Sequence, residues 1–203
     1  MRNRKLIGAG LTFVAFSLLG VQAIPASAAP AAFGAKLTKF SQPTGAERCD
    51  QNGDIPDNAT CTWVATTAFE NGDHFKAPKD GTIRHLKLIS CTAGTFTLQI
   101  ARVKFAAHQA KVVRNGPTIN YAADPQSECG GPDGDNYIIQ TFSVNVPVKT
   151  GDYIAVRAKR LGFIHNSGGG NTFLFAPPLA PGGPFETRDD ESSADLMLRL
   201  IYG

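Results

Sequence analysis

The sequence predicts an all-β fold, a two-sheet antiparallel sandwich, and three observations lead to it. Apolar and polar residues alternate with a period of two along several short segments. Clusters of asparagine, aspartate and glycine, which favour turns, separate these segments. No segment carries a sustained helical stripe of apolar residues between capping residues. Many short strands separated by turns, in one chain of 203 residues, are typical of a sandwich.

Each expected strand comes from a local run of this kind. In GTFTLQIARVK, for example, Phe96 and Leu98 alternate with Thr97 and Gln99, so the apolar pair faces the core. The predicted strands, in chain order, are CTWVATTAF (61–69), TIRHLKLIS (82–90), GTFTLQIARVK (94–104), AKVVRN (110–115), TINY (118–121), YIIQTFSVNVPV (137–148), GDYIAVRAKR (151–160), NTFLFA (171–176) and ADLMLRLIYG (194–203). The residues predicted to face the core are Phe96, Leu98, Ile100, Ile138, Phe142, Val144, Val146, Ile154, Val156, Ala158, Leu196, Leu198, Leu200 and Tyr202. The predicted turns are Asn71-Gly72-Asp73, Lys79-Asp80-Gly81, Asn115-Gly116-Pro117 and Thr150-Gly151-Asp152.

The number of strands bears on the topology. Eight or nine short strands in one domain favour a jelly roll among the sandwiches. An immunoglobulin-type sandwich is the alternative, but it has fewer strands, and Trp63 follows Cys61 too closely for the Cys…Trp…Cys order of that fold. We expect a single β-sandwich domain at 49–203, preceded at 29–48 by a small, polar and partly ordered lead-in.

Three segments, GTIRHLKLISC, FTLQIARVK and VPVKTGDYIAVRAKR, resemble small secreted β-sandwich proteins of actinomycetes. The resemblance covers residues 61–202, and its most specific piece is the strand–turn–strand VPVKTGDYIAV. That family has no established activity, so the resemblance implies export and fold and carries over no functional residue.

Residues 1–28 have the layout of a secretory signal peptide: a basic start, an apolar run and the small-x-small site from Ala26 to Ala28. We expect cleavage after Ala28 and secretion of the rest. A membrane anchor is the alternative reading of the apolar run, and Pro25 with the alanine-rich site favours cleavage. No second apolar run of that length follows, so we expect no membrane association after cleavage.

Cleavage also changes the charge balance. The full chain has 20 Lys and Arg against 17 Asp and Glu, a net charge of +3. Residues 1–28 contain Arg2, Arg4 and Lys5 and no acid, so removing them leaves 17 against 17, a net charge of zero. The basic excess belongs to the targeting segment, which removes the main support for nucleic-acid binding.

Four cysteines, an even number in an exported chain, predict two disulfides. Three pairings are open. Cys49–Cys61 with Cys91–Cys129 is preferred, because the first pair closes a short loop rich in turn residues. A structural zinc site is the rival reading, but no C-x-x-C spacing supports it.

The stretch CDQNGDIPDNATC (49–61) has acids and amides at alternate positions, as a calcium loop does. The candidate calcium ligands are Asp50, Asn52, Asp54 and Asp57. Ile55 stands where a curling loop needs glycine, so we interpret the stretch as a disulfide-closed polar turn and keep calcium, the one cofactor considered, as the alternative. Asp133 and Asp135 raise the same question in a glycine-rich loop.

Other candidate residues have plain structural interpretations. The histidines are His74, His85, His108 and His165, and they lack the His-x-His spacing of metal-dependent jelly-roll enzymes. We expect Trp63 to pack in the core, with Tyr121 and Tyr153 as surface aromatics. The proline-rich loop FLFAPPLAPGGPFE (173–186) is expected to cap one end of the sandwich, with a preformed binding rim as the alternative.

These observations predict a monomeric, secreted, non-catalytic protein that binds an extracellular ligand through its loops, such as a polysaccharide, a wall component or another protein. No catalytic residue stands out, because GxSxG is absent and every cysteine is assigned to a bridge. An extracellular hydrolase using a carboxylate pair is one alternative, and a structural exported protein without a small ligand is another.

Overall fold

The computed structural model describes residues 31–37, 43, 45–49, 58–67, 75–124, 129, 137–166 and 171–203. The predicted signal peptide at 1–28 lies outside this part. The described residues form antiparallel strands and one short 3-10 helix, η1 (Phe105–Ala107), with no α-helix among them. The predicted all-β class is confirmed.

The strands, in chain order, are β1 (Ala32–Gly34), β2 (Gly45–Arg48), β3 (Cys61–Thr67), β4 (Gly81–Leu88), β5 (Gly94–Lys104), β6 (Gln109–Tyr121), β7 (Gln140–Val148), β8 (Tyr153–Ala158), β9 (Arg160–Asn166), β10 (Asn171–Phe175), β11 (Glu186–Thr187), β12 (Asp190–Ser192), β13 (Ala194–Leu196) and β14 (Leu198–Tyr202). The segments predicted separately at 110–115 and 118–121 are one strand, β6, so the turn predicted at Asn115-Gly116-Pro117 does not form. Strand β9 was not predicted. Strands β1 and β2 fall within the segment 29–48.

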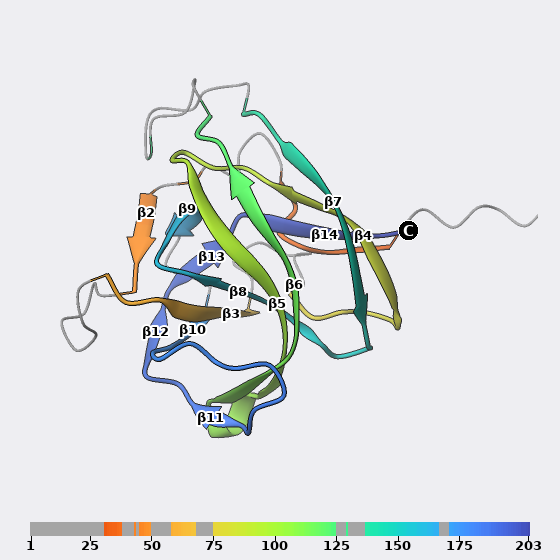
Figure 1. Cartoon of the computed structure of the whole chain (residues 1–203), viewed down its shortest axis with the longest axis vertical. Coiled ribbons are helices and arrows are strands. Elements are labelled where there is room, and N and C mark those ends of the chain that lie inside the picture. The colour runs from red at the N-terminus through yellow and green to blue at the C-terminus, as the bar shows by residue number, and fades with distance from the viewer. Residues whose placement is uncertain are drawn as a thin grey trace, which may run out of the picture.

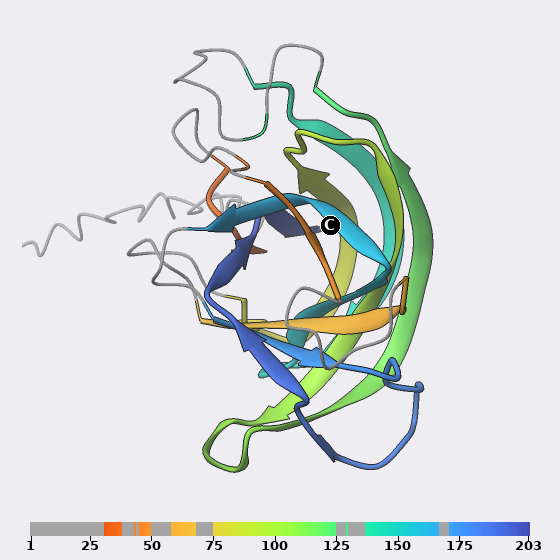
Figure 2. The ribbon, with the colours of Figure 1, turned by 90° about the vertical axis from the view of Figure 1, so that its left-hand side faces the viewer.

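The strands form two layers (Figure 1). The large layer has the order β11-β6-β5-β8-β3-β10-β12, and its long hairpin β5–β6 curves around one side of the molecule (Figure 2). The second layer consists of two sheets, β1-β14-β4-β7 and β13-β9-β2. Met197 joins these sheets, because its N–H donates to the Phe163 carbonyl (2.7 Å) and its carbonyl accepts from the Ile89 N–H (3.3 Å).

The order in which the chain visits the two layers is that of a jelly roll. From β2 to β9 successive strands alternate between the layers, except at the hairpin β5–β6. This gives β3-β8-β5-β6 in one layer, and β2-β9 together with β4-β7 in the other. The pair β13 and β14 departs from this plan, since it is inserted between β9 and β4.

The main core lies between the layers, and the side chains that alternation predicted to face it are buried in it or packed against it, with one exception. Trp63, Phe96, Leu98 and Leu200 are all buried there, as expected. Ile138 is 48% exposed, because β7 begins only at Gln140 and Ile138 lies before the ladder. The prediction for Ile138 was wrong.

A second core covers the outer face of the large layer. Its buried members are Val64, Ala101, Ala110, Val112, Ala155, Phe173, Phe175 and Leu179. Gln99 lies on this face, as its place in the alternation predicts, but it is fully buried because Leu179 and the loop around it cover it. The loop therefore turns one solvent-facing side of the sandwich into an interior.

Both disulfides form with the preferred pairing. Cys49 is bonded to Cys61 with Cα atoms 5.8 Å apart, and Cys91 to Cys129 with Cα atoms 5.1 Å apart. The first bond ties β3 to the residue after β2, and the second ties the residues after β4 to Cys129. Both therefore fix segments that border strands of the sandwich.

Candidate functional site

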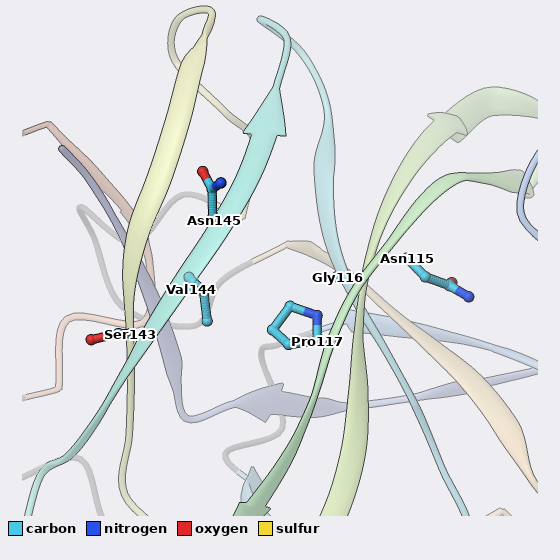
Figure 3. Close-up of a pocket in the computed structure, with 6 residues that line it drawn as sticks. All are labelled: Asn115, Gly116, Pro117, Ser143, Val144 and Asn145. Carbon is cyan, nitrogen blue, oxygen red and sulfur yellow. The ribbon is translucent and has the colours of Figure 1, made fainter.

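A groove opens between β6 and β7, on the side of the sandwich where the two layers end (Figure 3). Its volume is about 550 Å³. The lining residues are Asn115, Gly116, Pro117, Ser143, Val144 and Asn145. Both walls are strands rather than loops, so the site rests on rigid backbone.

The groove exists because both walls are edge strands. Among the described strands, β6 pairs on the side away from β5 with β11 alone, through Gln109 and Ala110. Within the described part of the chain, β7 pairs only with β4. Pro117 and Pro147 lie in these strands, and proline, which has no N–H to donate, is typical of edge strands. The ladders of both layers end here, and the sandwich stays open on this side.

A β-bulge shapes the wall formed by β6. Thr97 pairs with Thr118 and Gln99 with Asn115, so two steps along β5 correspond to three along β6. The extra residue lies at Gly116–Pro117, where a Cβ added to Gly116 would come within 3.0 Å of Val146 Cγ2. Glycine thus allows β6 to approach the core, and the bulge changes the directions of the neighbouring side chains.

The lining side chains form an apolar centre with polar flanks. In Figure 3, Pro117 and Val144 point toward each other across the gap. Ser143 and Asn115 point away from the gap on opposite sides. A ligand lying over this groove would meet apolar surface in the middle and hydrogen-bonding groups on either side.

Hydrogen bonds orient both amides of the groove. Asn145 Oδ1 accepts a hydrogen bond from Arg84 Nη1 (2.8 Å), and Asn115 Oδ1 accepts one from Gln99 Nε2 (2.9 Å). These hydrogen bonds fix both side chains and leave their NH₂ groups as the available donors. Gln99 is itself fixed by Thr62 Oγ1 (2.9 Å), so the position of Asn115 depends on a buried network.

The groove has little that could perform catalysis. Its six lining residues include no acid, histidine or cysteine. Ser143 provides a hydroxyl, and His85 lies directly opposite it in the β4–β7 ladder. No hydrogen bond joins these two described residues, so the serine lacks an engaged base.

The predicted metal ligands lie outside the described part of the chain, and the described histidines lie on separate elements. Asp50, Asn52, Asp54 and Asp57 lie outside the described residues, as do Asp133, Asp135 and His74. The remaining histidines are far apart: His85 on β4, His108 after η1, and His165 on β9. Across the described ranges, no group of three or more His, Cys, Asp or Glu residues is placed to hold a metal ion.

The aromatic predictions have mixed outcomes. Trp63 is fully buried in the main core, as predicted. Tyr121 was predicted at the surface, but it is buried against Phe163 (ring centroids 5.2 Å apart), and its hydroxyl accepts a hydrogen bond from the Gly162 N–H (2.9 Å). Burial raises its pKa. Tyr153 is half-buried beside the second core.

The proline-rich loop also lies elsewhere than predicted. It covers the outer face of the large layer rather than one end of the sandwich. Leu179 is buried, and its N–H donates to Thr62 Oγ1 at 3.0 Å. At the far end of the loop, the Phe185 ring receives Lys104 Nζ at 4.2 Å and Lys111 Nζ at 4.9 Å from its centroid. These contacts give the loop a structural role.

Sequence reasoning missed one unusual carboxyl group. Glu47 on β2 is only 9% exposed, and burial raises its pKa. The Ser192 hydroxyl donates to it (3.1 Å) and lowers the pKa, while the charge of nearby Asp190 raises it. A raised carboxyl pKa beside a second acid is a feature of some catalytic acids and also of purely structural clusters.

Within the described part of the chain, no helix has the length and apolar character needed to cross a membrane. Comparisons of the chain with known protein families, with curated proteins and with solved structures found no match.

Proposed function

We propose that this chain is an exported, non-catalytic protein that binds polysaccharide at the groove between β6 and β7. Two lines support export. Both disulfides belong to an oxidising compartment. The signal-peptide layout at 1–28 and the resemblance to secreted proteins of actinomycetes indicate the same destination.

The observation that carries the proposal is the chemistry of the groove lining. Pro117 and Val144 provide apolar surface, and the oriented amides of Asn115 and Asn145 provide donors beside it. Sugar rings present apolar C–H faces bordered by hydroxyl and ring oxygens that accept hydrogen bonds. A site with a few polar groups around an apolar patch suits such a ligand.

The experiment is affinity electrophoresis of the oxidised, processed protein through gels containing neutral polysaccharides, beside a pull-down on purified bacterial cell wall. The blocking variant is Pro117→Tyr, since Pro117 is half-buried, lines the groove and points into the gap (Figure 3). It should reduce the retardation of the protein by any neutral polysaccharide that it binds.

The matched control is Thr95→Tyr, which places the same side chain at an exposed strand position away from the groove. It should leave retardation unchanged. Equal retardation of wild type and Pro117→Tyr would remove the groove from the proposal. Release of reducing sugars above background would replace binding with catalysis.

A hydrolase is the second candidate, and Glu47 favours it. A desolvated carboxyl group with a raised pKa is a feature of general acids in glycoside hydrolysis. Glu47→Gln separates the alternatives, because a catalytic acid would lose turnover on substitution, whereas a structural group would only change the stability of the protein.

A further inference from the structure

The sheet β1-β14-β4-β7 carries basic side chains and no acid. None of its four strands contains Asp or Glu. Its basic residues are Arg84, His85, Lys87 and Arg199. We call the solvent-facing side of β14, β4 and β7, with these four residues, the cationic face.

The register fixes the direction of these side chains. In both β4 and β14, leucines at alternate positions point into the main core and are fully buried: Leu86, Leu88, Leu198 and Leu200. The residues between them therefore face solvent. Lys87 lies directly opposite Arg199 in the β4–β14 ladder, and opposite Thr141 in the β4–β7 ladder.

Two cations directly opposite each other on one sheet face repel and destabilise the folded protein. Some basic residues elsewhere in the described structure have partners. Arg102 pairs with Asp152 (3.2 Å), and Lys104 and Lys111 share the Phe185 ring. Within the described ranges, neither Lys87 nor Arg199 forms an ion pair. A bound anion would neutralise this repulsion. The folded protein with an anionic ligand bound at this pair is therefore favoured over the folded protein without one.

The cationic face continues into the groove. Arg84 donates to Asn145, which lines the groove, and Ser143, another lining residue, lies directly opposite His85. A chain lying along the groove would therefore place its substituents over β4 and β14. This arrangement suits an extended polymer with repeated charges better than a small ion.

We propose that the cationic face makes the protein selective for acidic polysaccharides, those bearing carboxylate or phosphate groups, over neutral ones. The proposal rests on the proposed function, because it names the class of polysaccharide that the groove takes. Sugar is favoured over nucleic acid because the cations border a neutral groove, and because the chain without residues 1–28 has no net positive charge.

The test compares two double variants with the same change in net charge. Lys87→Gln with Arg199→Gln removes the cationic pair, and Lys104→Gln with Lys111→Gln removes two cations that have an aromatic partner. Binding is measured to polygalacturonate, to polysaccharide phosphate purified from cell walls, to neutral dextran and to double-stranded DNA. The salt concentration is set to about 20 mM and then about 150 mM, which shortens the screening length to about 8 Å.

The first variant should bind both acidic polymers about ten-fold more weakly than wild type at low salt, with a smaller difference at high salt. The second should bind them as wild type does. Thermal unfolding of the first variant without ligand should occur at the same or a higher temperature, because a repulsion is removed. Its loss of binding would then not reflect a loss of fold.

An equal loss in both double variants would reduce the effect to net charge and overturn the proposal, as would no preference of the wild type for polygalacturonate over dextran. Tighter binding to DNA than to either acidic polysaccharide would overturn the assignment of the ligand. Pro117→Tyr, which lies on β6 and outside the cationic face, separates the two proposals. If it binds acidic polymers normally while the Lys87 and Arg199 variant does not, the cationic face is supported as the binding surface and the groove is excluded.

Discussion

The Asp80 carboxylate accepts two hydrogen bonds from Thr150, from its backbone N–H (2.7 Å) and from its hydroxyl (2.8 Å). These bonds join the turn before β4 to the turn between β7 and β8, at one end of the β4–β7 pair. Both hydrogen bonds favour the ionised form and hold the pKa of Asp80 below its ordinary value of 3.8.

We predict that Asp80→Asn makes the free energy of unfolding less dependent on pH under acidic conditions. A pKa lowered by folding contributes stability above pH 3.8, and this contribution is lost as the pH falls through the lower pKa of the folded state. Wild type should therefore lose more stability than Asp80→Asn in that window, measured by urea unfolding. Thr150→Ala keeps the backbone hydrogen bond and should show a smaller change than Asp80→Asn. Parallel pH profiles would contradict the prediction.

Glu47 should behave in the opposite way. Its pKa in the folded protein is raised above the ordinary 4.5, chiefly by burial, so folding binds a proton that the unfolded chain has released. Stability should then fall as the pH rises from about 4.5 through the pKa of the folded state. Glu47→Gln removes the charge and should melt at a higher temperature than wild type at pH 7. The difference should shrink toward pH 4, and a lower melting temperature at pH 7 would show that the carboxylate is stabilising.

Thr62 should be essential to the buried network beneath the proline-rich loop. Its hydroxyl donates to Gln99 Oε1 and accepts the Leu179 N–H, and both Thr62 and Gln99 are fully buried. Thr62→Val keeps the shape but leaves two buried polar groups unpaired, which should cost about 1–3 kcal/mol in the free energy of unfolding. In the control Thr97→Val, the lost partner is the exposed Thr118 hydroxyl, and the cost should be smaller. Equal costs would show that water reaches the network.

Gly34 and Gly182 allow a comparison of two glycines with positive φ. Both lie in the left-handed region (φ 104° and 76°), where an L side chain is strained by about 1–2 kcal/mol. Alanine at Gly182 meets nothing within 4 Å, so it should cost only this strain. At Gly34 the new Cβ would collide with the carbonyl oxygen of Leu198, and the cost should be clearly larger. Chemical unfolding of the two variants checks the order, and equal costs would refute it.

Alternation predicted most strands because it reports which backbone segments have one apolar side. It missed β9, since Leu161, Phe163 and Ile164 are all buried and the pattern loses its period. Gln99 shows a second limit. Its face was correctly predicted, but the residues that cover it come from Leu179 and its neighbours, distant in sequence. A local pattern gives the direction of a side chain and not what lies over it.

The groove could not be predicted for a related reason. Asn115 and Pro117 are typical turn residues, and only pairing with β5 shows that they form a bulge within a strand. The sequence pattern did not indicate the cationic pair either, because Lys87 and Arg199 become neighbours only through the insertion of β14 beside β4. Strand order, which creates both features, depends on contacts across the whole domain.

The position of β13 and β14 has a consequence for biogenesis. These strands follow the others in the chain, yet they occupy the middle of the second layer, between β9 and β4. While residues 194–202 remain in the ribosome, both neighbours have open edges and compaction cannot finish. With the export proposed above, late closure of this kind would keep the nascent polypeptide extended for threading through a translocation channel, and final folding would follow on the far side of the membrane.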